Sequence, residues 1–336
     1  MGPVVRRFPS PHRASASAAS AHAAHAAQGT EIHWVGPGRN GQEVVAGVAS
    51  IHMAWGGAHS LCVRGHALRL DDEVFLTLNA GHVLTARGRR DPGASLLSVY
   101  FAPDLLADAL ADFAVSEREL LSSWTQSGTL YLFEHLRERD KSIDSVMRYI
   151  AHHVCEGVDD PHWYEEQVRF LLRRALANEA AIVRTIGAVS CTKAWKRREI
   201  FLRLARVTDL IHSAYERPLT IAELAEAAHW SVFHMMREFK AVHGVSPHEF
   251  LQRRRTQAAA RLLCSTELPV SEVAERVGFH DRSTLMRRLQ RSHGIGARAL
   301  RVLAPTFRKS PQQTPHRKPT AAASRVNSAT SISPVR

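Results

Sequence analysis

The chain has 336 residues, a length that favours two folded domains with additional terminal segments. It carries 44 Lys and Arg residues against 32 Asp and Glu residues, so its formal net charge is +12. This excess favours a polyanionic partner, with nucleic acid the first candidate and a membrane surface the second. The hydrophobic content of 45% provides a sizeable core and excludes wholesale disorder. No run of 18 apolar residues occurs, which excludes a transmembrane helix.

The first 30 residues are rich in Ala, Ser and His and contain no acidic residue. Organellar transit peptides share this composition, but the apolar segment of a secretory signal is missing. We expect residues 1–30 to be a disordered extension or an over-long start of the reading frame. The four cysteines, at positions 62, 155, 191 and 264, lie far apart and include no CxxC pair. Neither a disulfide framework nor a structural zinc site is therefore expected, and a reducing cytoplasm is the simpler interpretation.

The positive charge is concentrated near the end of the chain. Residues 201–304 carry 16 basic and 10 acidic groups, and residues 305–336 carry six basic groups and no acidic group. Residues 31–200 are slightly acidic, so the affinity for a polyanion is expected in the last third. Residues 305–336 are rich in Pro, Ser, Thr and Ala, which predicts a disordered basic tail. This tail is either a weak electrostatic tether to DNA or a solvated segment without a role.

Residues 31–190 change character partway. Short apolar runs at 48–51, 60–63, 73–78 and 95–101 are separated by Gly-rich or charged turns, which is typical of strands in a small barrel or sandwich. After Asp104 the apolar residues recur every three or four positions, which predicts a helix there and others near 141–156 and 162–178. The following stretch, 191–200, contains four basic residues and is expected to connect this unit to the next domain.

An internal repeat with a constant offset of 50 residues occupies the last third. Met235, Arg237 and Phe239 in the first copy correspond to Leu285, Arg287 and Leu289 in the second. A unit of about 50 residues is long enough for two or three helices.

Local rules predict the helices of the first copy. Thr220 and Glu223 form a capping box that begins a short helix, and Ser231 is a good N-cap for a second helix after a tight turn. Met235 and Phe239 then point inward at positions i and i+4. The opposite, exposed face carries Phe233, Met236, Arg237 and Lys240. Two short helices joined by a tight turn predict a helix-turn-helix unit whose second helix fits the major groove.

The second copy follows a long helix. Ser246, Pro247 and Glu249 provide an N-cap, a proline at the first position and an acidic third residue, so the helix is expected to run from there to about residue 264. The second copy opens near residue 270, turns at Gly278 and restarts at Asp281 as the N-cap. Its outward residues are Arg282, Ser283, Met286, Arg287 and Gln290.

Residues 219–301 resemble the DNA-binding domain of the AraC/XylS family of bacterial transcription regulators, in the runs IAELAEAAHWSVFHMMREFK, GVSPHEFLQRRRTQAAARLL and SEVAERVGFHDRSTLMRRLQRSHG. The resemblance implies two helix-turn-helix units joined by a long linker helix, with one recognition helix from each unit in successive major grooves. It implies base contacts from Phe233, Met236 and Arg237 in the first unit, and from Arg282, Ser283, Met286 and Arg287 in the second. The residue types predict phosphate contacts from Ser231, Lys240, Arg255 and Thr284.

The sequence departs from the family pattern at a few positions. Gly296 and Ala297 replace the usual Ser-Pro pair, and Leu300 replaces an aromatic residue, which predicts a less firm last helix. In the long helix, Arg254 and Thr256 replace the usual leucines. This substitution predicts looser packing of the linker helix on the second unit.

Residues 71–82, DDEVFLTLNAGH, resemble the cupin-like N-terminal regions of many members of the same family. The resemblance implies a β-barrel that, with the helices after it, senses a small molecule or forms a dimer. His52, His59, His66 and His82 raise the alternative of a metal-binding cupin enzyme, but no His-x-His pair with a following Glu is present. No catalytic residue, metal ligand or cofactor is therefore expected.

The sequence thus predicts an α+β chain. Its expected parts are a disordered extension (1–30), a cupin-like sensor and dimerisation domain with trailing helices (31–190), a linker (191–200), an all-α AraC-type double helix-turn-helix domain (201–304) and a disordered basic tail (305–336).

The predicted function is that of a sequence-specific transcription regulator, an effector-responsive activator by resemblance, and not an enzyme. Double-stranded DNA, a small-molecule effector, RNA polymerase and a second copy of the chain are the expected partners, and no membrane is. The expected location is the bacterial cytoplasm, in association with the nucleoid. Two alternatives remain open: a metal-dependent cupin-type enzyme fused to a DNA-binding domain, and a nucleoid-type protein that binds DNA without sequence preference. The salt dependence of binding together with the specificity ratio separates the last of these from a regulator.

Overall fold

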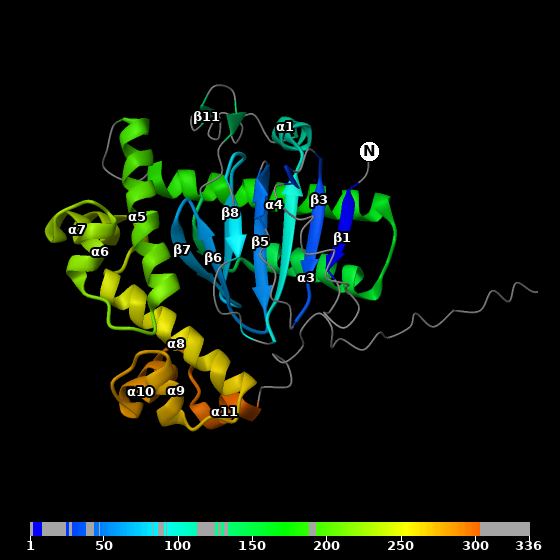
Figure 1. The fold of residues 1–336 in the computed structure, drawn as a ribbon. Coiled ribbons are helices and arrows are strands. Elements are labelled where there is room, and N and C mark those ends of the chain that lie inside the picture. The colour runs from blue at the N-terminus through cyan, green and yellow to red at the C-terminus, as the bar shows by residue number, and fades with distance from the viewer. Residues whose placement is uncertain are drawn as a thin grey trace, which may run out of the picture.

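The computed structural model describes residues 3–8, 25–26, 29–37, 44–46, 48–82, 84–86, 91, 93–112, 125–126, 129–130, 134–187 and 193–302. Strands occupy the N-terminal part of these ranges and helices the C-terminal part (Figure 1). The strands are β1 (Val4–Phe8), β2 (His25–Ala26), β3 (Glu31–Val35), β4 (Val44–Ala46), β5 (Ala49–Trp55), β6 (His59–Val63), β7 (His66–Leu70), β8 (Val74–Leu78), β9 (Leu84–Ala86), β10 (Ser95–Phe101), β11 (Thr125–Gln126), β12 (Thr129–Leu130) and β13 (Leu136–Glu138). The helices are α1 (Pro103–Ala111), α3 (Lys141–Glu156), α4 (Pro161–Gly187), α5 (Ala194–Ala214), α6 (Ile221–Ala227), α7 (Val232–His243), α8 (Pro247–Ser265), α9 (Val270–Arg276), α10 (Arg282–His293) and α11 (Ala297–Val302).

The described strands form two facing sheets. The inner sheet has the order β1-β3-β10-β5-β8-β13, the outer sheet has the order β2-β4-β9-β6-β7, and β11 and β12 form a separate pair. The predicted strand runs are confirmed, since they coincide with β5, β6, β8 and β10. The cupin-like closed barrel is not confirmed. Within the described residues the chain passes from the outer to the inner sheet at the turn between β7 and β8 without a ladder joining the two sheets, so the unit is an open sandwich.

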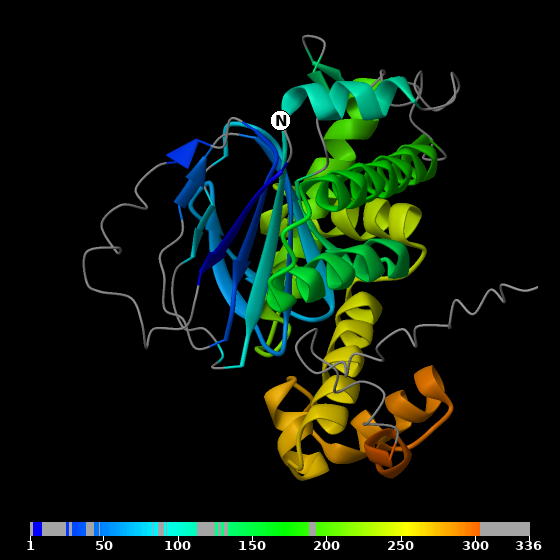
Figure 2. The same cartoon turned by 90° about the vertical axis from the view of Figure 1, so that its right-hand side faces the viewer.

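The inner sheet is buried on both faces because helices cover the face away from the outer sheet. Side chains alternate along β5, so that Ile51, Met53 and Trp55 point to the helices while Ala54 points to the outer sheet. The helix side of this core comes from α1, α3 and α4, with Met147 and Leu171 fully buried. Figure 2 shows the sheets on one side and the helices on the other. The helices predicted after residue 104 and near 141–156 and 162–178 are therefore confirmed.

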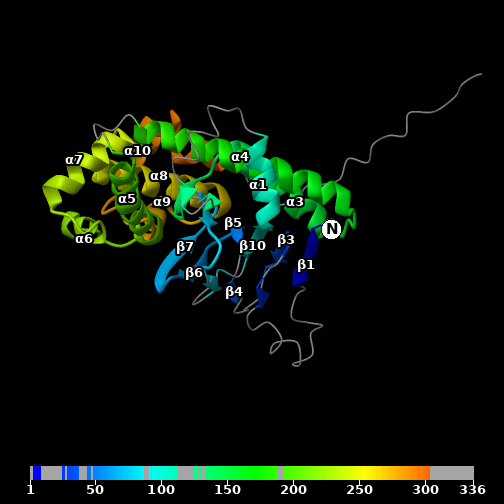
Figure 3. The ribbon, with the colours of Figure 1, turned by 90° about the horizontal axis from the view of Figure 1, so that it is seen from above.

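Helices α5 to α11 share one hydrophobic core. It includes Leu204 and Ile211 of α5, Met235 and Phe239 of α7, and Leu285 of α10, all of them fully buried. Seen from above, these helices gather at the β7 end of the sheets, away from β1 (Figure 3).

Two of the predicted boundaries need correction. Residues 1–30 are not wholly a disordered extension: β1 pairs with β3 in parallel, and the Nε atom of Arg6 donates to Glu31 at 2.9 Å. A short strand at residues 25–26 also pairs with β4, while residues 9–24 lie outside the described residues. The predicted linker 191–200 is helical from residue 194 onward, and its Ile200 joins the hydrophobic core of helices α5 to α11. The predicted tail, 305–336, lies outside the described residues.

Candidate nucleic-acid interface

The first helix-turn-helix unit consists of α6 and α7, and local contacts fix both ends of the turn between them. The Thr220 and Glu223 capping box is formed in both directions at the start of α6. The Oγ atom of Ser231 accepts from the backbone nitrogen of His234 at 3.3 Å and so caps α7. The turn places His229 in the left-handed region at φ 53°, and its backbone nitrogen donates to the carbonyl of Glu226. These contacts confirm the predicted caps and present α7 as a recognition helix.

The second unit, α9 and α10, repeats this arrangement. The carboxylate of Asp281 accepts from the backbone nitrogen of Thr284 at 2.7 Å, so Asp281 is the N-cap of α10 as predicted. Leu285 and Leu289 are fully buried. Gly278 occupies the turn at φ 86°, where it corresponds to His229 of the first unit. The departures from the family pattern predict a less firm last helix, but α11 forms and buries Ala297 and Leu300.

The predicted base-contact residues all lie on α7 or α10, and most of them are exposed. Phe233 is 76% exposed and Met236 is 42% exposed, which is unusual for large apolar side chains. Arg282, Ser283 and Arg287 are also exposed, as is the side chain of Arg237. Met286 differs from Met236 because it is half-buried and packs against the core of the helical domain.

Neighbouring side chains orient the two arginines. The guanidinium of Arg237 donates twice to the same carboxylate oxygen of Glu238, at 3.1 and 2.8 Å. Arg287 donates to the hydroxyl of Thr284 at 3.3 Å, and that hydroxyl donates to Asp281 at 2.8 Å. Neighbouring side chains therefore hold each guanidinium in place on the helix surface, and its other N–H groups can donate to a ligand.

The four predicted phosphate-contact residues are placed differently from one another. Ser231 and Lys240 are exposed on α7, whereas Thr284 is half-buried and engaged with Asp281. Arg255 is buried, and its guanidinium donates to the backbone carbonyls of Tyr215 at 2.8 Å and of Arg217 at 2.9 Å. Because these bonds hold the end of α5 against α8, the guanidinium of Arg255 lies inside the protein, away from the exposed faces of α7 and α10. The predicted phosphate contact of Arg255 therefore needs correction.

The sequence did not predict the ion pairs of three other arginines of the helical domain. Arg288 on α10 donates to both carboxylate oxygens of Glu249 on α8, at 2.9 and 2.7 Å, and so ties the second recognition helix to the linker helix. Arg254 and Arg261 on α8 pair with Asp71 and Asp72 of the N-terminal sandwich. The sequence signal was an arginine at an apolar position of the linker helix, but its partner lies 183 residues earlier in the chain.

The four histidines that suggested a metal centre do not converge. Both ring nitrogens of the fully buried His52 contact serine hydroxyls at 2.9 Å, those of Ser50 and Ser98, and burial lowers the pKa of His52 to about 3. His59 is buried on β6, His66 is exposed on β7, and His82 pairs with Glu134 at 2.7 Å. Among the described residues no group of three His, Cys, Asp or Glu side chains is arranged to hold a metal ion.

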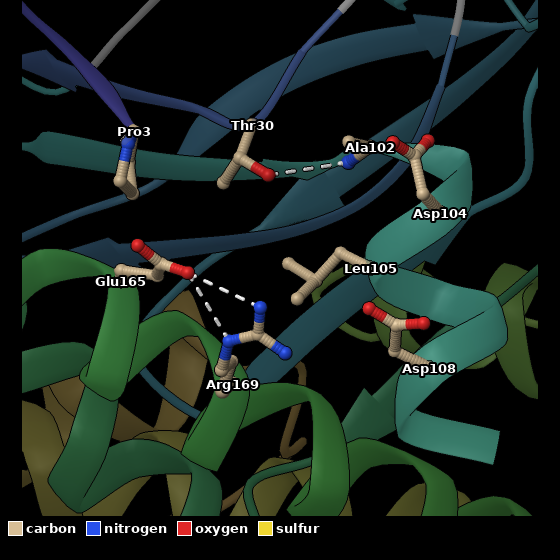
Figure 4. Close-up of a pocket in the computed structure, with 8 residues that line it drawn as sticks. All are labelled: Pro3, Thr30, Ala102, Asp104, Leu105, Asp108, Glu165 and Arg169. Atoms are coloured by element: carbon tan, nitrogen blue, oxygen red, sulfur yellow. Dashed lines mark hydrogen bonds and ion pairs between the residues drawn. The ribbon is translucent and has the colours of Figure 1, made fainter. Parts of the chain in front are cut away.

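A hollow of about 160 Å³ lies beside α1 and α4 (Figure 4). Within it Arg169 pairs with Glu165 at 3.1 Å, while Asp104 and Asp108 add negative charge. This volume is smaller than the roughly 300 Å³ at which small-molecule sites begin, and the acidic lining does not suit a polyanion. The hollow is lined by Pro3, Thr30, Ala102, Asp104, Leu105, Asp108, Glu165 and Arg169.

Comparison with known proteins places the similarity in the helical domain. Residues 224–302 match the family described as "Helix-turn-helix domain". The chain is 43% identical over 76 residues to the uncharacterized HTH-type transcriptional regulator YfiF of Bacillus subtilis, which covers 23% of this chain and 24% of YfiF. It is 28% identical over 92 residues to the multiple antibiotic resistance protein MarA of Escherichia coli, which covers 27% of this chain and 72% of MarA. The chain thus spans only about a quarter of the length of YfiF.

Among solved structures, the DNA-binding domain of the global transcriptional factor AdpA in complex with a target DNA is similar. The identity is 28%, the TM-score is 0.29, and the match covers 32% of this chain and 96% of the AdpA domain.

No helix in the described part of the chain is both long and apolar enough to cross a membrane. The structure has two N-capped helices, α7 and α10, with the linker helix α8 between them, and the sequence matches fall on the same residues. The C-terminal domain of this chain is a helix-turn-helix domain of the AraC type.

Proposed function

We propose that the protein is a sequence-specific transcription regulator that places α7 and α10 in two successive major grooves of double-stranded DNA. The observation that carries this proposal is the repeated presentation of an oriented arginine, Arg237 on α7 and Arg287 on α10, on the exposed face of an N-capped helix. Two such helices on one side of a duplex lie about 34 Å apart, which is one helical turn.

The residue types suggest a division of roles. Arg237 and Arg287 donate bidentate hydrogen bonds to guanine, each worth about 1–3 kcal/mol of discrimination against the wrong base. Phe233 and Met236 supply apolar contacts to thymine methyl groups, and Arg282 and Ser283 lie at the start of α10, where a recognition helix meets base edges. Met286 reads bases only through the part of its side chain that the core leaves open. Ser231 and Lys240 hold phosphates, whereas Thr284 orients Arg287 directly and is itself held by Asp281.

Binding without sequence preference is the main rival to this function. A nucleoid-type protein needs phosphate contacts alone, and its affinity falls equally for all sequences as salt rises. The exposed Phe233 and Met236 favour base reading, because apolar side chains gain nothing from phosphates. An enzymatic N-terminal domain has no support of this kind, since both ring nitrogens of His52 are engaged by serines.

Selection of bound sequences from a random DNA pool by the full-length protein tests the proposal. The salt concentration should be about 150 mM, so that phosphate binding alone is suppressed. We expect two enriched blocks about one helical turn apart, with the selected site bound roughly 10³-fold or more tightly than random DNA. A pool without enriched blocks, from a protein that still binds DNA at low salt, would support the nucleoid-type rival.

Substitution of Arg287 should separate base reading from phosphate binding. We expect Arg287→Ala to reduce discrimination at one base position by about 1–3 kcal/mol, because the bidentate donor is lost. Lys240→Ala should weaken binding to all sequences alike and lower the salt slope by about one. Arg276→Ala is the matched control, since Arg276 is an exposed arginine that pairs with Glu272 on α9. Equal losses of Arg287→Ala on specific and random DNA would contradict the assignment.

The N-terminal sandwich is proposed to serve as a sensor and dimerisation domain, and the regulator as an activator that contacts RNA polymerase. Two exposed aromatic residues on adjacent helices support a dimer: Tyr149 on α3 and Phe170 on α4, which are 48% and 41% exposed. On α4, Glu166 and Arg174 lie four residues either side of Phe170 and are also exposed. A two-fold axis at Phe170 would therefore bring each glutamate to the arginine of the second copy.

Phe170→Ser should shift the protein from dimer to monomer, because it removes the apolar centre of this face. Sedimentation velocity at micromolar concentration measures the change. Leu202→Ser is the control, since Leu202 is 38% exposed but lies on α5. A variant that sediments as the wild-type dimer would show that another face is used.

A further inference from the structure

Within the described residues, three ion pairs join the N-terminal sandwich to the helical domain, and their sandwich partners lie at the end of β7 and in the turn that follows it. A carboxylate oxygen of Asp71 accepts from the Nη2 atom of Arg254 on α8 at 2.5 Å, and both side chains are almost completely buried. Asp72 pairs with Arg261, which also belongs to α8 and lies seven residues after Arg254. Arg69 pairs with Glu216, just after α5, at 2.7 Å. The turn Asp71–Glu73 therefore contacts the middle and the second half of the linker helix.

The sandwich itself holds both aspartates in position. The backbone nitrogen of Glu73 donates to the second carboxylate oxygen of Asp71 at 3.0 Å. The backbone nitrogens of Gly56 and Gly57 donate to the two carboxylate oxygens of Asp72, at 3.0 and 3.1 Å. The orientation of these carboxylates therefore depends on the β5–β6 and β7–β8 turns, and α8 meets a preformed acidic surface.

Asp71 is the principal counter-ion of Arg254. The guanidinium lies 4.5 Å from the ring centre of Tyr215, and within the described residues its Nε and Nη1 atoms are buried without a hydrogen-bond partner. Burial alone would raise the pKa of Asp71, but the neighbouring Arg254 and Arg261 lower it overall, so the carboxylate is ionised. Removing the charge of Asp71 would leave the guanidinium of Arg254 buried without its principal counter-ion. The contact between the sandwich and α8 would then loosen as water reaches the guanidinium.

The two recognition helices are attached to the sandwich by different routes. The first unit is connected through α5, where Asp209 accepts from the backbone nitrogen of Leu136 on β13 at 2.7 Å, and Ser213 accepts from that of Arg69 on β7 at 3.1 Å. The second unit is connected through α8, to which Arg288 ties α10. Figure 1 shows α5 beside β7, and α8 lying between α6 and α7 above it and α9, α10 and α11 below it. Arg255 also holds α8 to the end of α5, so the sandwich contacts are a second constraint on α8, and movement of α8 relative to both the sandwich and α5 would move α10 relative to α7.

We propose that Asp71 and Asp72 are positioning residues for DNA recognition: by pinning α8 to the sandwich, they fix the placement of α10 relative to α7. They thereby determine which spacing between the two DNA blocks the protein accepts. As acidic residues of the N-terminal sandwich they act through Arg254 and Arg261 and touch no DNA themselves. The inference rests on the proposed function, in which both recognition helices read bases.

A library of two-block operators with variable spacing tests this inference on the full chain. The two selected blocks are kept constant, and the spacer between them is varied one base pair at a time over about one helical turn. We expect the wild type to show a narrow optimum and Asp71→Asn/Asp72→Asn to show a broad one. The preference for the best spacing over a spacing changed by about half a turn should fall roughly tenfold in the double variant.

Variants on the other side of the junction keep the test independent of local damage to the turn. Arg261→Gln leaves the sandwich untouched, and should broaden the spacing optimum in the same direction as Asp72→Asn. Combining the two should add little to either alone, because both remove the same ion pair. Glu272→Gln is the matched control, since it removes a carboxylate from an exposed ion pair within α9 and should leave the spacing optimum unchanged.

The outcomes separate the inference from the proposed function. A thermal melt first establishes that each variant is folded at the temperature of the selection. Folded Asp71→Asn/Asp72→Asn and Arg261→Gln variants with the spacing optimum of the wild type would overturn the inference, while the proposed function would stand. If the wild type itself enriched only one block, or none, the proposed function would fail instead.

Discussion

Acidification from pH 7 to pH 5 should lower the free energy of unfolding by about 5 kcal/mol, because four histidines stay neutral in the folded chain. Burial lowers the pKa of His52 and His212 to about 3 and that of His243 to about 4, and it lowers the pKa of His135 well below 6.5. His135, His212 and His243 come from β13, α5 and α7 or their ends, and each has a buried ring nitrogen without a partner in the described residues.

The sign follows from proton binding in the two states. Below pH 6.5 the unfolded chain takes up a proton on each imidazole and the folded chain does not, so stability is lost as the pH falls through this range. Each histidine contributes about 2 kcal/mol of this loss between pH 7 and pH 5. Asp209 acts in the opposite direction, since burial raises its pKa to about 8 and its folded form binds the proton first, which restores about 3 kcal/mol. Arg137 and Arg254 lie near His135 and His212 and further disfavour their protonation, while Asp71 favours that of His212.

Urea unfolding at half-unit intervals of pH measures this loss. His212→Gln should reduce the change between pH 7 and pH 5 by about 2 kcal/mol, because it removes one of the four protons. Asp209→Asn should increase it, since the compensating carboxyl group is lost. His66→Gln is the control, because His66 is exposed on β7 and should leave the pH profile unchanged. A wild-type profile that is flat between pH 7 and pH 5 would show that the folded chain accommodates these protons.

Gly278→Ala should destabilise the helical domain by about 3 kcal/mol, which would make it one of the most damaging single-methyl additions in this chain. Gly278 adopts a φ of +86°, which costs a residue with a Cβ atom about 1 kcal/mol. The added Cβ would also lie 2.7 Å from the backbone carbonyl oxygen of Glu216 and 2.9 Å from the guanidinium of Arg255. Because Arg255 donates to the carbonyls of Tyr215 and Arg217, it has little freedom to move away. Relieving these overlaps should cost about 2 kcal/mol more.

A second glycine separates the two contributions. Gly294 has a φ of +68° after α10, but nothing lies within 4 Å of the position that an added Cβ would occupy. Gly294→Ala should therefore cost only the conformational part, about 1 kcal/mol. Urea unfolding of both variants measures the difference, and equal losses would contradict the steric role of Arg255 and Glu216. Gly278→Ala should also weaken specific DNA binding more than Gly294→Ala does, since the turn at Gly278 sets the angle between α9 and α10.

His229 occupies the position of Gly278 in the first unit and supports this interpretation. Its φ of 53° is left-handed, yet the turn forms with the same backbone bonds: His229 donates to Glu226 and Trp230 donates to Ala225. A side chain is thus accepted in this turn where the backbone alone is strained. The two units share one turn geometry: Arg255 lies against the turn of the second, whereas in the first Arg203 donates to the backbone carbonyl of His229 at 3.1 Å.

The helical domain could be predicted from the sequence in detail, because the signals there are local. The caps at Thr220, Ser231, Ser246 and Asp281 act within three residues of themselves, and the inward residues Met235, Phe239, Leu285 and Leu289 follow the helical period. Four strands of the N-terminal unit, β5, β6, β8 and β10, were also predicted, since short apolar runs between turn residues mark them. The sheet topology was not, because strand order depends on contacts between segments far apart in the chain.

The directions in which the arginines of α8 point depend on the packing of the whole chain. Arg254, Arg255 and Arg261 lie within eight residues of one helix, and no local rule distinguishes a base, a phosphate, a carbonyl or an aspartate as their partner. The guanidinium of Arg255 donates to two backbone carbonyls at the end of α5, and that of Arg254 donates to Asp71, which lies 183 residues earlier in the chain. In the same way, β1 joined the sheet through parallel pairing with β3, a contact that composition alone cannot reveal. Long-range pairing of charges and strands is fixed by how whole elements pack, and this packing placed the linker helix against the N-terminal sandwich.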